Sequence, residues 1–536
     1  VNKPQGEFWT SHPDGGYDVK ETSSAAHFYG KPIASAEAFT GSRYYHCFAD
    51  QKNSADYAYA FGVNEFVLCA SAYQPWIDKY PGSTAGGKHY CLNRNNTYWE
   101  YSRPFWDYQA RCSALMRKGV PVVDICVYLG QNPPVKLVTY RLPEIPEGYD
   151  FDVCTAEALV GRTMAVDGRL TLPTGISYSL LVIQRNNDMP LHVLRHIAGL
   201  VKGGVIVCGP RPDGSDSLKD KAESEEYRAL VDELWGELTT VSQIRKVGKG
   251  KIYENIPLSE VLKYENIRPD IAIKSGNTAK DKVYFVHRRL SDADVYFLNN
   301  HSDRAFHDTV RLRTDARQAE YWDAVTGQRY MIPVKASGEK GMLLNLTLAP
   351  RESGFIVTSN NQATGLLPII ADVQETITPI EGSWNVYFDP RWGGPGKVVF
   401  DELIDWTVHA DTGIRYYSGT AVYHKELNLA IPAQNERLLL RFPRLGSLAR
   451  VWVNGKEVVT VWCSPWEADI TSYVHEGKNN LKIEVVNSLM NRMIGDASLP
   501  ESERFTYAYP QIATPTDKLV PSGIMEQLNL VYRQCQ

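Results

Sequence analysis

The sequence lacks several features that would place it in other classes of protein. No stretch of about 18 uncharged apolar residues occurs, so no membrane span is expected. The 57 basic and 62 acidic residues give a formal net charge of −5, which provides no basic surface for nucleic acid. Neither GxGxxG nor GxxxxGK[ST] is present, so no nucleotide site is predicted.

Cysteine is sparse and has no metal-binding spacing. The nine cysteines form neither a CxxC pair nor a zinc-type Cys/His pattern, and several lie in apolar runs such as the one that ends at Cys208. We therefore predict buried free thiols, with no zinc site and no disulfide framework.

The composition indicates a globular protein of several domains. A chain of 536 residues with 43% hydrophobic content is large enough for three or four cores. Aromatic residues make up 11%, with 31 Tyr and 12 Trp. Such rings bind sugars, although the cores of β-sandwiches use the same residue types.

Two carboxylates lie at equivalent points of neighbouring predicted strands. Residues 32–40 form an apolar run without strict alternation, which is typical of a strand covered on both faces, and Glu37 lies near its end. Glu7, beside Phe8 and Trp9, lies about one β-α unit upstream. Glycoside hydrolysis requires two such acids. The alternative for each is an ion pair with a buried Arg or Lys.

Further candidates surround this pair. A third strand, residues 65–76, ends in a polar and aromatic cluster, and a polar loop follows at residues 81–98. Asn64, near a strand start, either orients substrate or caps a turn. The predicted substrate-binding residues are Trp9, Asn64, Tyr73, Gln74, Trp76 and His89.

The order of predicted elements divides the chain into multidomain α/β and all-β parts. Residues 1–118 read as the C-terminal part of a (β/α)8 barrel, including a helix at 54–61. Residues 119–252, with strands at 120–130, 179–183 and 203–209 around a helix at 190–201, read as a flavodoxin/amidotransferase-like α/β domain. We expect a β-sandwich at 253–365 and an eight-stranded, galactose-binding-like jelly roll at 366–536.

Two further expectations follow from this division. An Asn-Gly hairpin at residues 454–455 is the clearest turn signal of the last domain. Because the sequence starts at a barrel strand, we expect an N-terminal remainder of the enzyme upstream.

With these motifs assembled, the chain resembles the C-terminal half of glycoside hydrolase family 106, the α-L-rhamnosidases. The resemblance rests on Gly-Glu-Phe-Trp at 6–9, Ala-Glu-Ala-Phe-Thr at 36–40, the run 64–76 and Ser-Arg-Pro-Phe-Trp at 102–106. Residues 418–423, 451–456, 469–471 and 477–481 resemble the sugar-binding domain of family 2 glycosidases.

The resemblance implies a function as well as a fold. It implies inverting hydrolysis of terminal α-L-rhamnosides, assisted by carboxylates and by a calcium ion that helps to hold the sugar hydroxyls. Glu37 then carries over as general acid or base, and Glu7 as its partner or the metal ligand. A periplasmic or secreted location follows from this class of substrate.

Two other functions compete with this one. A non-catalytic carbohydrate-binding protein would use Trp452, Trp462 and Trp466 of the last domain as a stacking platform, unless these rings fill a core. A β-galactosidase-like glycosidase would share the same sequence of domains.

Overall fold

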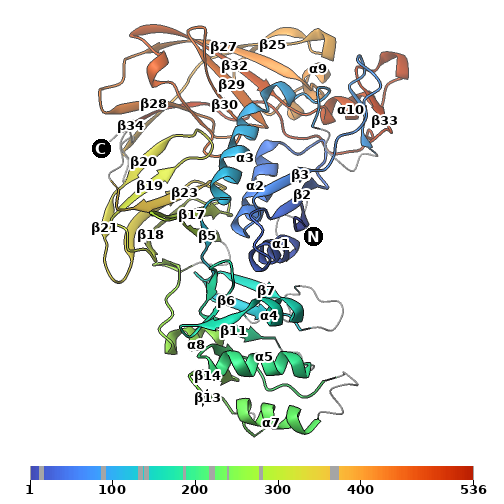
Figure 1. Cartoon of the computed structure of the whole chain (residues 1–536). Coiled ribbons are helices and arrows are strands. Elements are labelled where there is room, and N and C mark those ends of the chain that lie inside the picture. Colours follow the sequence, from blue (N-terminus) through green and yellow to red (C-terminus); the bar gives the residue numbers. More distant parts are fainter. Residues whose placement is uncertain are drawn as a thin grey trace.

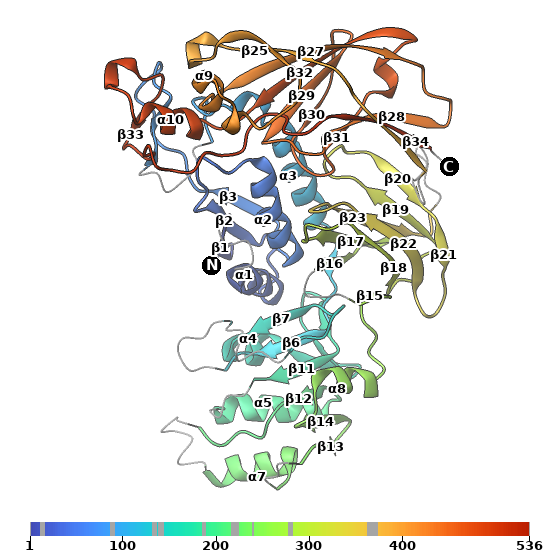
Figure 2. The same cartoon turned by 180° about the vertical axis from the view of Figure 1, so that it is seen from behind.

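The chain folds into several sheet-rich parts with fewer helices (Figure 1). The computed structural model describes residues 2–10, 17–85, 92–130, 137, 144–184, 189–215, 224–237, 241–276, 282–361 and 374–534. Figures 1 and 2 show an α/β lobe at one end, two-layered β structure at the other, and the first strands and helices between them. No described helix is long and apolar enough to cross a membrane.

The first part alternates strands and helices. Its elements are β1 (Gln5–Trp9), α1 (Tyr17–Phe28), β2 (Ser35–Thr40), α2 (Phe48–Ala60), β3 (Glu65–Leu68), β4 (Pro81–Ser83), η2 (Trp99–Tyr101) and α3 (Arg103–Met116). β1, β2 and β3 are parallel, in that order, and β2 is buried along nearly its whole length, as its lack of alternation predicted. A closed barrel of eight strands stays a prediction.

The helix predicted at 54–61 is longer in the structure and begins earlier. α2 begins at Phe48, because the Asp50 carboxylate accepts a hydrogen bond from the backbone N–H of Cys47 (2.8 Å) and caps the first turn. α2 and α3 then pack in one core, where the Phe48 and Phe105 rings stack at 4.7 Å. The same core includes Phe297 of the following sandwich and Trp462 of the last part, so it joins three parts of the chain.

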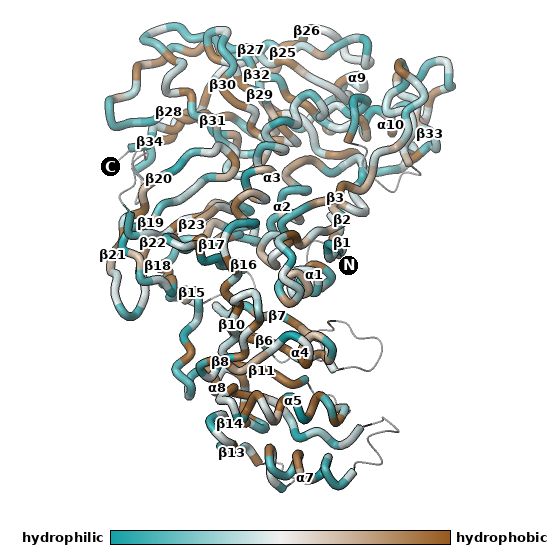
Figure 3. Tube along the Cα trace, viewed as in Figure 1, coloured by the Kyte–Doolittle hydropathy of each residue, from teal (hydrophilic) through white to brown (hydrophobic). Residues whose placement is uncertain are grey.

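The second part is the predicted open, mainly parallel sheet. Its elements are β6 (Ile125–Tyr128), β7 (Phe151–Cys154), α4 (Ala156–Arg162), β8 (Met164–Val166), β9 (Arg169–Thr171), β10 (Ser177–Tyr178), β11 (Leu180–Ile183), α5 (Leu191–Lys202), β12 (Ile206–Cys208), α7 (Ser224–Trp235), β13 (Gln243–Val247), β14 (Gly250–Glu254) and α8 (Leu258–Tyr264). The strand order is β13-β14-β12-β11-β6-β7, with only β13 antiparallel among the described strands. Along α5 hydrophobic and hydrophilic residues alternate (Figure 3), and its apolar side is buried.

The prediction of a single strand at 120–130 is wrong, because two strands occupy this range. β5 (Val120–Pro121) pairs with the following sandwich, and only β6 joins the parallel sheet. Asp124 lies between them, where the Arg313 guanidinium donates to both of its carboxylate oxygens (2.7 and 3.0 Å). A buried carboxylate must be paired, and this pairing turns the chain between two sheets.

A buried polar cluster joins α1 to β7. Asp152 accepts hydrogen bonds from His27 Nδ1 (2.8 Å), Tyr178 Oη (2.8 Å) and Ser24 Oγ (3.1 Å). Burial opposes ionisation of Asp152, but His27 and the nearby Lys20 outweigh it and hold the pKa of this carboxyl well below its usual range. The cluster therefore locks the first part onto the parallel sheet.

The third part is the predicted β-sandwich. Its strands are β15 (Ile271–Ile273), β16 (Val283–Arg289), β17 (Ala293–Asn300), β18 (Phe306–Leu312), β19 (Gln318–Trp322), β20 (Arg329–Ile332), β21 (Val334–Ala336), β22 (Met342–Leu348) and β23 (Ser353–Ser359). They form one sheet in the order β15-β18-β22-β21 and another in the order β20-β19-β23-β17-β16-β5. The two sheets enclose a core of buried aliphatic and aromatic side chains.

The last part is also a two-layered β structure. Its elements are β24 (Glu375–Pro379), β25 (Trp384–Phe388), η4 (Pro390–Trp392), β26 (Gly396–Phe400), η5 (Trp406–Val408), α9 (Thr412–Arg415), β27 (Thr420–Leu429), β28 (Glu436–Arg441), β29 (Leu448–Val453), β30 (Lys456–Val461), β31 (Glu467–Asp469), η6 (Thr471–Tyr473), β32 (Gly477–Val486), α10 (Met490–Asp496), η7 (Glu501–Glu503), β33 (Tyr507–Tyr509) and β34 (Asn529–Gln534).

Its two sheets contain more strands than the eight predicted. A four-stranded sheet, β24-β34-β28-β31, lies against a six-stranded sheet, β26-β25-β27-β32-β29-β30. Asn454 and Gly455 both have positive φ (51° and 77°) and join β29 to β30, so the predicted Asn-Gly hairpin is confirmed. The jelly-roll connectivity stays a prediction.

The prediction of free thiols is confirmed for the described cysteines. All seven are unbridged, and five of these are buried. Cys91 and Cys535 lie outside the described residues.

Candidate active site

The two predicted catalytic glutamates lie side by side. β1 pairs with β2 so that Glu7 is the register partner of Glu37, on strands that run parallel. Neighbouring strands are about 4.7–4.9 Å apart, so the two side chains leave the sheet from adjacent positions. Both residues are partly exposed. The sequence prediction that the two carboxylates occupy equivalent points of adjacent strands is confirmed.

An irregularity of β2 shapes the surroundings of Glu37. The register shifts so that Trp9 pairs with Thr40, which leaves one extra residue on β2, and Phe39 has a φ of 64°. A positive φ is costly for an aromatic residue, and burial of the ring compensates. Phe39 packs edge-to-face on Phe8 and is almost fully buried.

The irregularity places a hydroxyl beside the carboxylate. Thr40 Oγ1 donates to Glu37 Oε1 (3.1 Å), and the Cys69 thiol, directly after β3, lies against Glu37 as well. Burial, and next the hydrogen bond with Glu37, raise the pKa of Cys69, so this thiol stays protonated. Sequence reasoning missed both contacts, because only the extra residue on β2 turns Thr40 toward Glu37.

The alternative role for these glutamates, an ion pair with a buried Arg or Lys, does not apply to Glu7 or Glu37 among the described residues, but Glu65 forms ion pairs. Within the described part of the chain, neither Glu7 nor Glu37 forms a salt bridge. Glu65, at the start of β3, pairs with Lys3 and with Arg117 (3.3 Å). Glu7 and Glu37 lie within β1 and β2, so the prediction that Glu37 lies near the end of its strand is wrong, but both carboxylates are without an ion pair to a described residue.

Two predicted substrate contacts have structural hydrogen bonds. Asn64 is buried near the strand starts, where its Oδ1 accepts from Ala34 N (3.0 Å) and its Nδ2 donates to Pro32 O (3.0 Å). Gln74 donates to Ser83 O (2.7 Å) and accepts from Ser83 N (2.9 Å), which fixes the loop after β3. Of the two readings of Asn64, its position favours the turn cap over substrate binding.

The other predicted contacts are aromatic. Trp9, next to Thr40, is 44% exposed and Tyr73 is 83% exposed, so both rings can meet a ligand. Trp76 is half-buried and packs edge-to-face on Tyr507 of β33, with ring centroids 5.1 Å apart. His89 lies outside the described residues. The contact with Tyr507, which comes from the last part of the chain, is not predicted by the sequence.

The oxygen donors around Glu7 and Glu37 bear on the calcium ion that the family resemblance implies. Ca²⁺ takes six to eight oxygen ligands. The described residues contain no group of three or more His, Cys, Asp or Glu placed to hold a metal ion. Glu7, Glu37 and the Thr40 hydroxyl supply hard oxygen donors of the right kind, and the remaining ligands would be carbonyl, water or sugar oxygens.

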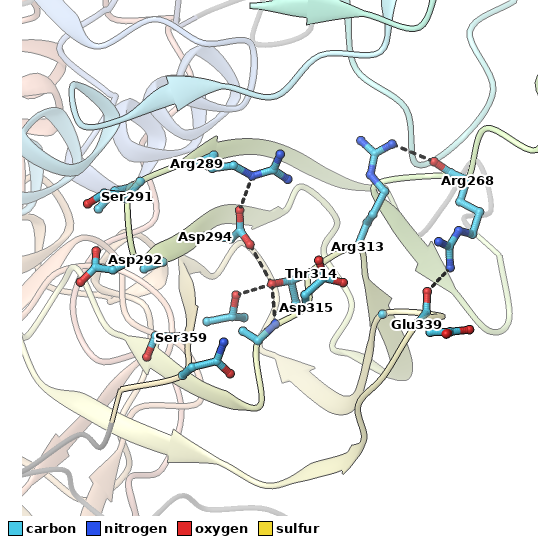
Figure 4. Close-up of a pocket in the computed structure, with 16 residues that line it drawn as sticks. Arg268, Arg289, Ser291, Asp292, Asp294, Arg313, Thr314, Asp315, Glu339 and Ser359 are labelled. Atoms are coloured by element: carbon cyan, nitrogen blue, oxygen red, sulfur yellow. Dashed lines mark hydrogen bonds and ion pairs between the residues drawn. The ribbon is translucent and has the colours of Figure 1, made fainter. Parts of the chain in front are cut away.

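A cavity of about 450 Å³ lies elsewhere, on the β-sandwich (Figure 4). Its walls come from residues between 268 and 360, and none belongs to β1, β2 or β3. Figure 4 shows Arg289 directed at Asp294, which also accepts from Thr314 Oγ1 (2.7 Å). Arg289 and Asp294 are engaged with each other, and the lining includes no residue of the strands that carry Glu7 and Glu37, so we do not place the reaction here.

The wall of this cavity continues into a buried chain of charges. His287 Nε2 contacts Asp294 Oδ1 (3.0 Å) and its Nδ1 contacts Asp270 Oδ2 (2.9 Å), while Arg313 Nε donates to Asp270 Oδ1 (3.2 Å). Burial disfavours charge on His287, but the two carboxylates outweigh burial and raise its pKa. Burial is likewise outweighed at Asp294, where His287 lowers the pKa to about 2. Arg313 also donates to Asp124, so these charged residues connect the sandwich to the parallel sheet.

The proposed stacking platform of the last part is not a continuous surface. Trp462 is buried in the core with Phe105 and Tyr108. Lys482 Nζ lies 3.7 Å from the centroid of the Trp452 ring. Trp462 is therefore not available to bind a sugar, which argues against the non-catalytic carbohydrate-binding alternative.

Comparison with known proteins agrees with the geometry. The model of the glycoside hydrolase 106 family, described as alpha-L-rhamnosidase, matches residues 1–335. The model of the glycosyl hydrolases family 2 sugar binding domain matches residues 371–532.

A rhamnosidase structure from Novosphingobium sp. PP1Y is similar over 99% of this chain and 51% of that chain, with a TM-score of 0.89 and 28% identity. A curated Formosa agariphila protein named "Putative beta-glucuronidase" is 24% identical over 92% of this chain. A Ruminococcus gnavus beta-glucuronidase structure covers 31% of this chain and 29% of its own, at 22% identity and a TM-score of 0.23. The chain spans 60% of the length of the curated relative.

Proposed function

The chain belongs to the glycoside hydrolase family 106 α-L-rhamnosidases, with a family 2 type sugar-binding domain toward its end, and from this premise we propose its reaction. The enzyme that contains it releases terminal α-L-rhamnose from glycans or plant polysaccharides, with inversion of the anomeric centre. Carbohydrate is the substrate, and the enzyme acts in the periplasm or after secretion.

One observation carries the proposal: Glu7 and Glu37 occupy register positions on adjacent parallel strands, both partly exposed and free of cationic partners in the described chain. Two carboxylates with a ring such as Trp9 beside them meet the needs of glycosidic cleavage. The similarity to a rhamnosidase at a TM-score of 0.89 supports rhamnose as the sugar.

The roles are assigned from the family resemblance, and the local contacts support them. Glu37, which Thr40 and Cys69 contact, is proposed as the general acid or base. Glu7 lies beside it and acts as its partner or as a calcium ligand. A bound Ca²⁺ would supply a hard cation for the vicinal hydroxyls of the sugar.

The reaction type is tested with 4-nitrophenyl α-L-rhamnopyranoside and the full-length enzyme. We expect release of nitrophenol, and proton NMR of the first-formed rhamnose should show the β anomer. The α anomer as first product would contradict inversion, and no turnover would contradict the proposed function. The β-galactosidase alternative is tested with 4-nitrophenyl β-galactopyranoside, and the matching glucuronide tests the activity that the name of the curated relative gives.

The calcium proposal needs a readout besides activity. Calorimetric titration of the EGTA-treated enzyme with CaCl₂ should show binding, and Glu7→Gln should weaken it. Equal Ca²⁺ binding by the wild-type enzyme and the variant would exclude Glu7 as a ligand.

A further inference from the structure

A segment of the last part of the chain lies against the loops that follow β2 and β3. We call residues 489–513, which include α10 and β33, the C-terminal arm. Tyr44, after β2, is buried in one cluster with Leu489, Met493, Ile494 and Ala513 of the arm. Tyr80, after β3, packs on the same cluster. Figures 1 and 2 show α10 and β33 beside the ends of these strands.

Backbone pairing joins the arm to the loop after β3. β33 and β4 form a two-stranded parallel sheet in which Tyr507 pairs with Pro81 and Tyr509 with Ser83. Tyr507 N donates to Tyr80 O (2.7 Å), and Thr84 N donates to Tyr509 O (2.9 Å). These bonds hold the loop from the side of the arm, in addition to the Gln74–Ser83 hydrogen bonds within the loop.

The arm is also held by hydrogen bonds within itself. Asp496, almost fully buried, accepts from Thr506 N (2.7 Å), Thr506 Oγ1 (2.6 Å) and Arg492 Nε (2.9 Å). The guanidinium of Arg492 lies 5.0 Å from the Phe505 ring. β33 is thus held by its pairing with β4 and by the hydrogen bonds between Thr506 and Asp496, and these contacts orient its side chains before a ligand binds.

The pairing gathers aromatic rings of the loop after β3 and of the arm, of which Tyr73 and Tyr509 are exposed and Trp76 and Tyr507 are half-buried. Trp76 lies 5.1 Å from Tyr507 and 6.4 Å from Tyr509, measured between ring centroids. Tyr509 of the arm is 64% exposed, and Tyr73, in the loop after β3, is more exposed still. Exposed aromatic side chains that cluster in this way mark binding surfaces. The loop that carries Tyr73 and Trp76 starts at Cys69, which contacts Glu37.

We propose that Tyr509 and Tyr507, with Trp76 and Tyr73, form a platform for the sugar residue to which the terminal rhamnose is linked. The inference rests on the proposed function and extends it to the leaving group. Loops after parallel strands line the substrate site in folds of this type, and the arm completes this one. Aromatic faces bind the apolar face of a pyranose ring, and Tyr hydroxyls remain available to its polar groups.

The test compares two substrates in the full-length enzyme. α-L-Rhamnosyl fluoride has no sugar in its leaving group, whereas rutinose carries glucose there. Tyr509→Ala should lower kcat/KM for rutinose relative to the fluoride by about 3- to 10-fold, mainly through KM. Tyr509→Phe, which keeps the ring, should retain most of this ratio. Tyr264→Ala, at a comparably exposed tyrosine of α8, is the matched control and should leave the ratio unchanged.

The same platform is tested without turnover. In a Glu37→Gln background, calorimetry with rutinose and with free rhamnose should show that Tyr509→Ala weakens binding of the disaccharide only. An unchanged ratio and unchanged rutinose affinity, or an equal loss for both ligands, would overturn the platform. Failure of the wild-type enzyme to cleave either substrate would contradict the proposed function, and the calorimetric comparison would still decide the platform.

Discussion

Replacement of Glu37 by glutamine removes the proposed proton-transfer group with little change of structure. Glutamine has the size of glutamate, and its amide oxygen can still accept the hydrogen bond that Thr40 Oγ1 donates to Glu37 (3.1 Å). Because Glu37 is partly exposed and has no salt bridge to a described residue, the free energy of unfolding should change by less than about 0.5 kcal/mol. A loss of activity would therefore report on chemistry.

The expected loss follows from the role. A positioned general acid or base contributes about 10²- to 10⁴-fold, or roughly 3–5 kcal/mol of transition-state stabilisation. As the acid, Glu37 protonates the leaving oxygen. The variant then loses this factor on methyl α-L-rhamnoside and less than about tenfold on the 2,4-dinitrophenyl glycoside, whose leaving group needs no proton. As the base, Glu37 activates water, and both substrates lose the factor.

The assay measures initial rates on both rhamnosides in the full-length enzyme, with the melting temperature recorded in parallel. Glu65→Gln is the matched control, because Glu65 lies on the adjacent strand but is paired with Lys3 and Arg117. It should leave the rate ratio of the two substrates unchanged. Full activity of Glu37→Gln on both rhamnosides would refute the assignment.

Three further predictions concern the frame around the site. Asp152→Asn should destabilise the protein by about 1–3 kcal/mol, because it removes a buried carboxylate that accepts hydrogen bonds from His27, Tyr178 and Ser24, and thermal unfolding measures this. His287, whose pKa is raised by Asp270, stabilises the fold while protonated, so its contribution should be full below about pH 6.5 and should disappear as the pH rises above its raised pKa. Urea unfolding of wild type and His287→Gln at several pH values checks this. Gly82→Ala should lower activity on rutinose, because a Cβ at its φ of 75° would lie 2.5 Å from Gln74 Oε1 and disturb the loop after β3.

Each of these predictions has a clear contrary result. A melting temperature unchanged in Asp152→Asn would show that the cluster between α1 and β7 does not lock the two parts together. A constant stability difference between wild type and His287→Gln from pH 5 to pH 9 would remove the proposed role of the imidazolium. Normal kinetics of Gly82→Ala would mean that the loop tolerates the displaced Gln74 side chain.

The sequence by itself determined the elements whose causes are local. The unalternating run around Glu37 predicts a doubly covered strand, and β2 is one, because small and apolar residues on both sides demand burial. The Asn454-Gly455 pair specifies its hairpin through the positive φ that both residues tolerate. Two acids one β-α unit apart predict adjacent carboxylates, since parallel strands bring equivalent positions together.

Only the tertiary structure decided what depends on contacts between distant segments. The extra residue on β2 turns Thr40 toward Glu37, and the cost of the positive φ at Phe39 is met by a core that includes residues from three parts of the chain. Asp124 ends a predicted strand because Arg313, nearly two hundred residues later, neutralises it. The arm that carries Tyr509 reaches the loop after β3 through backbone hydrogen bonds, which any sequence can make and which therefore leave no signal in it.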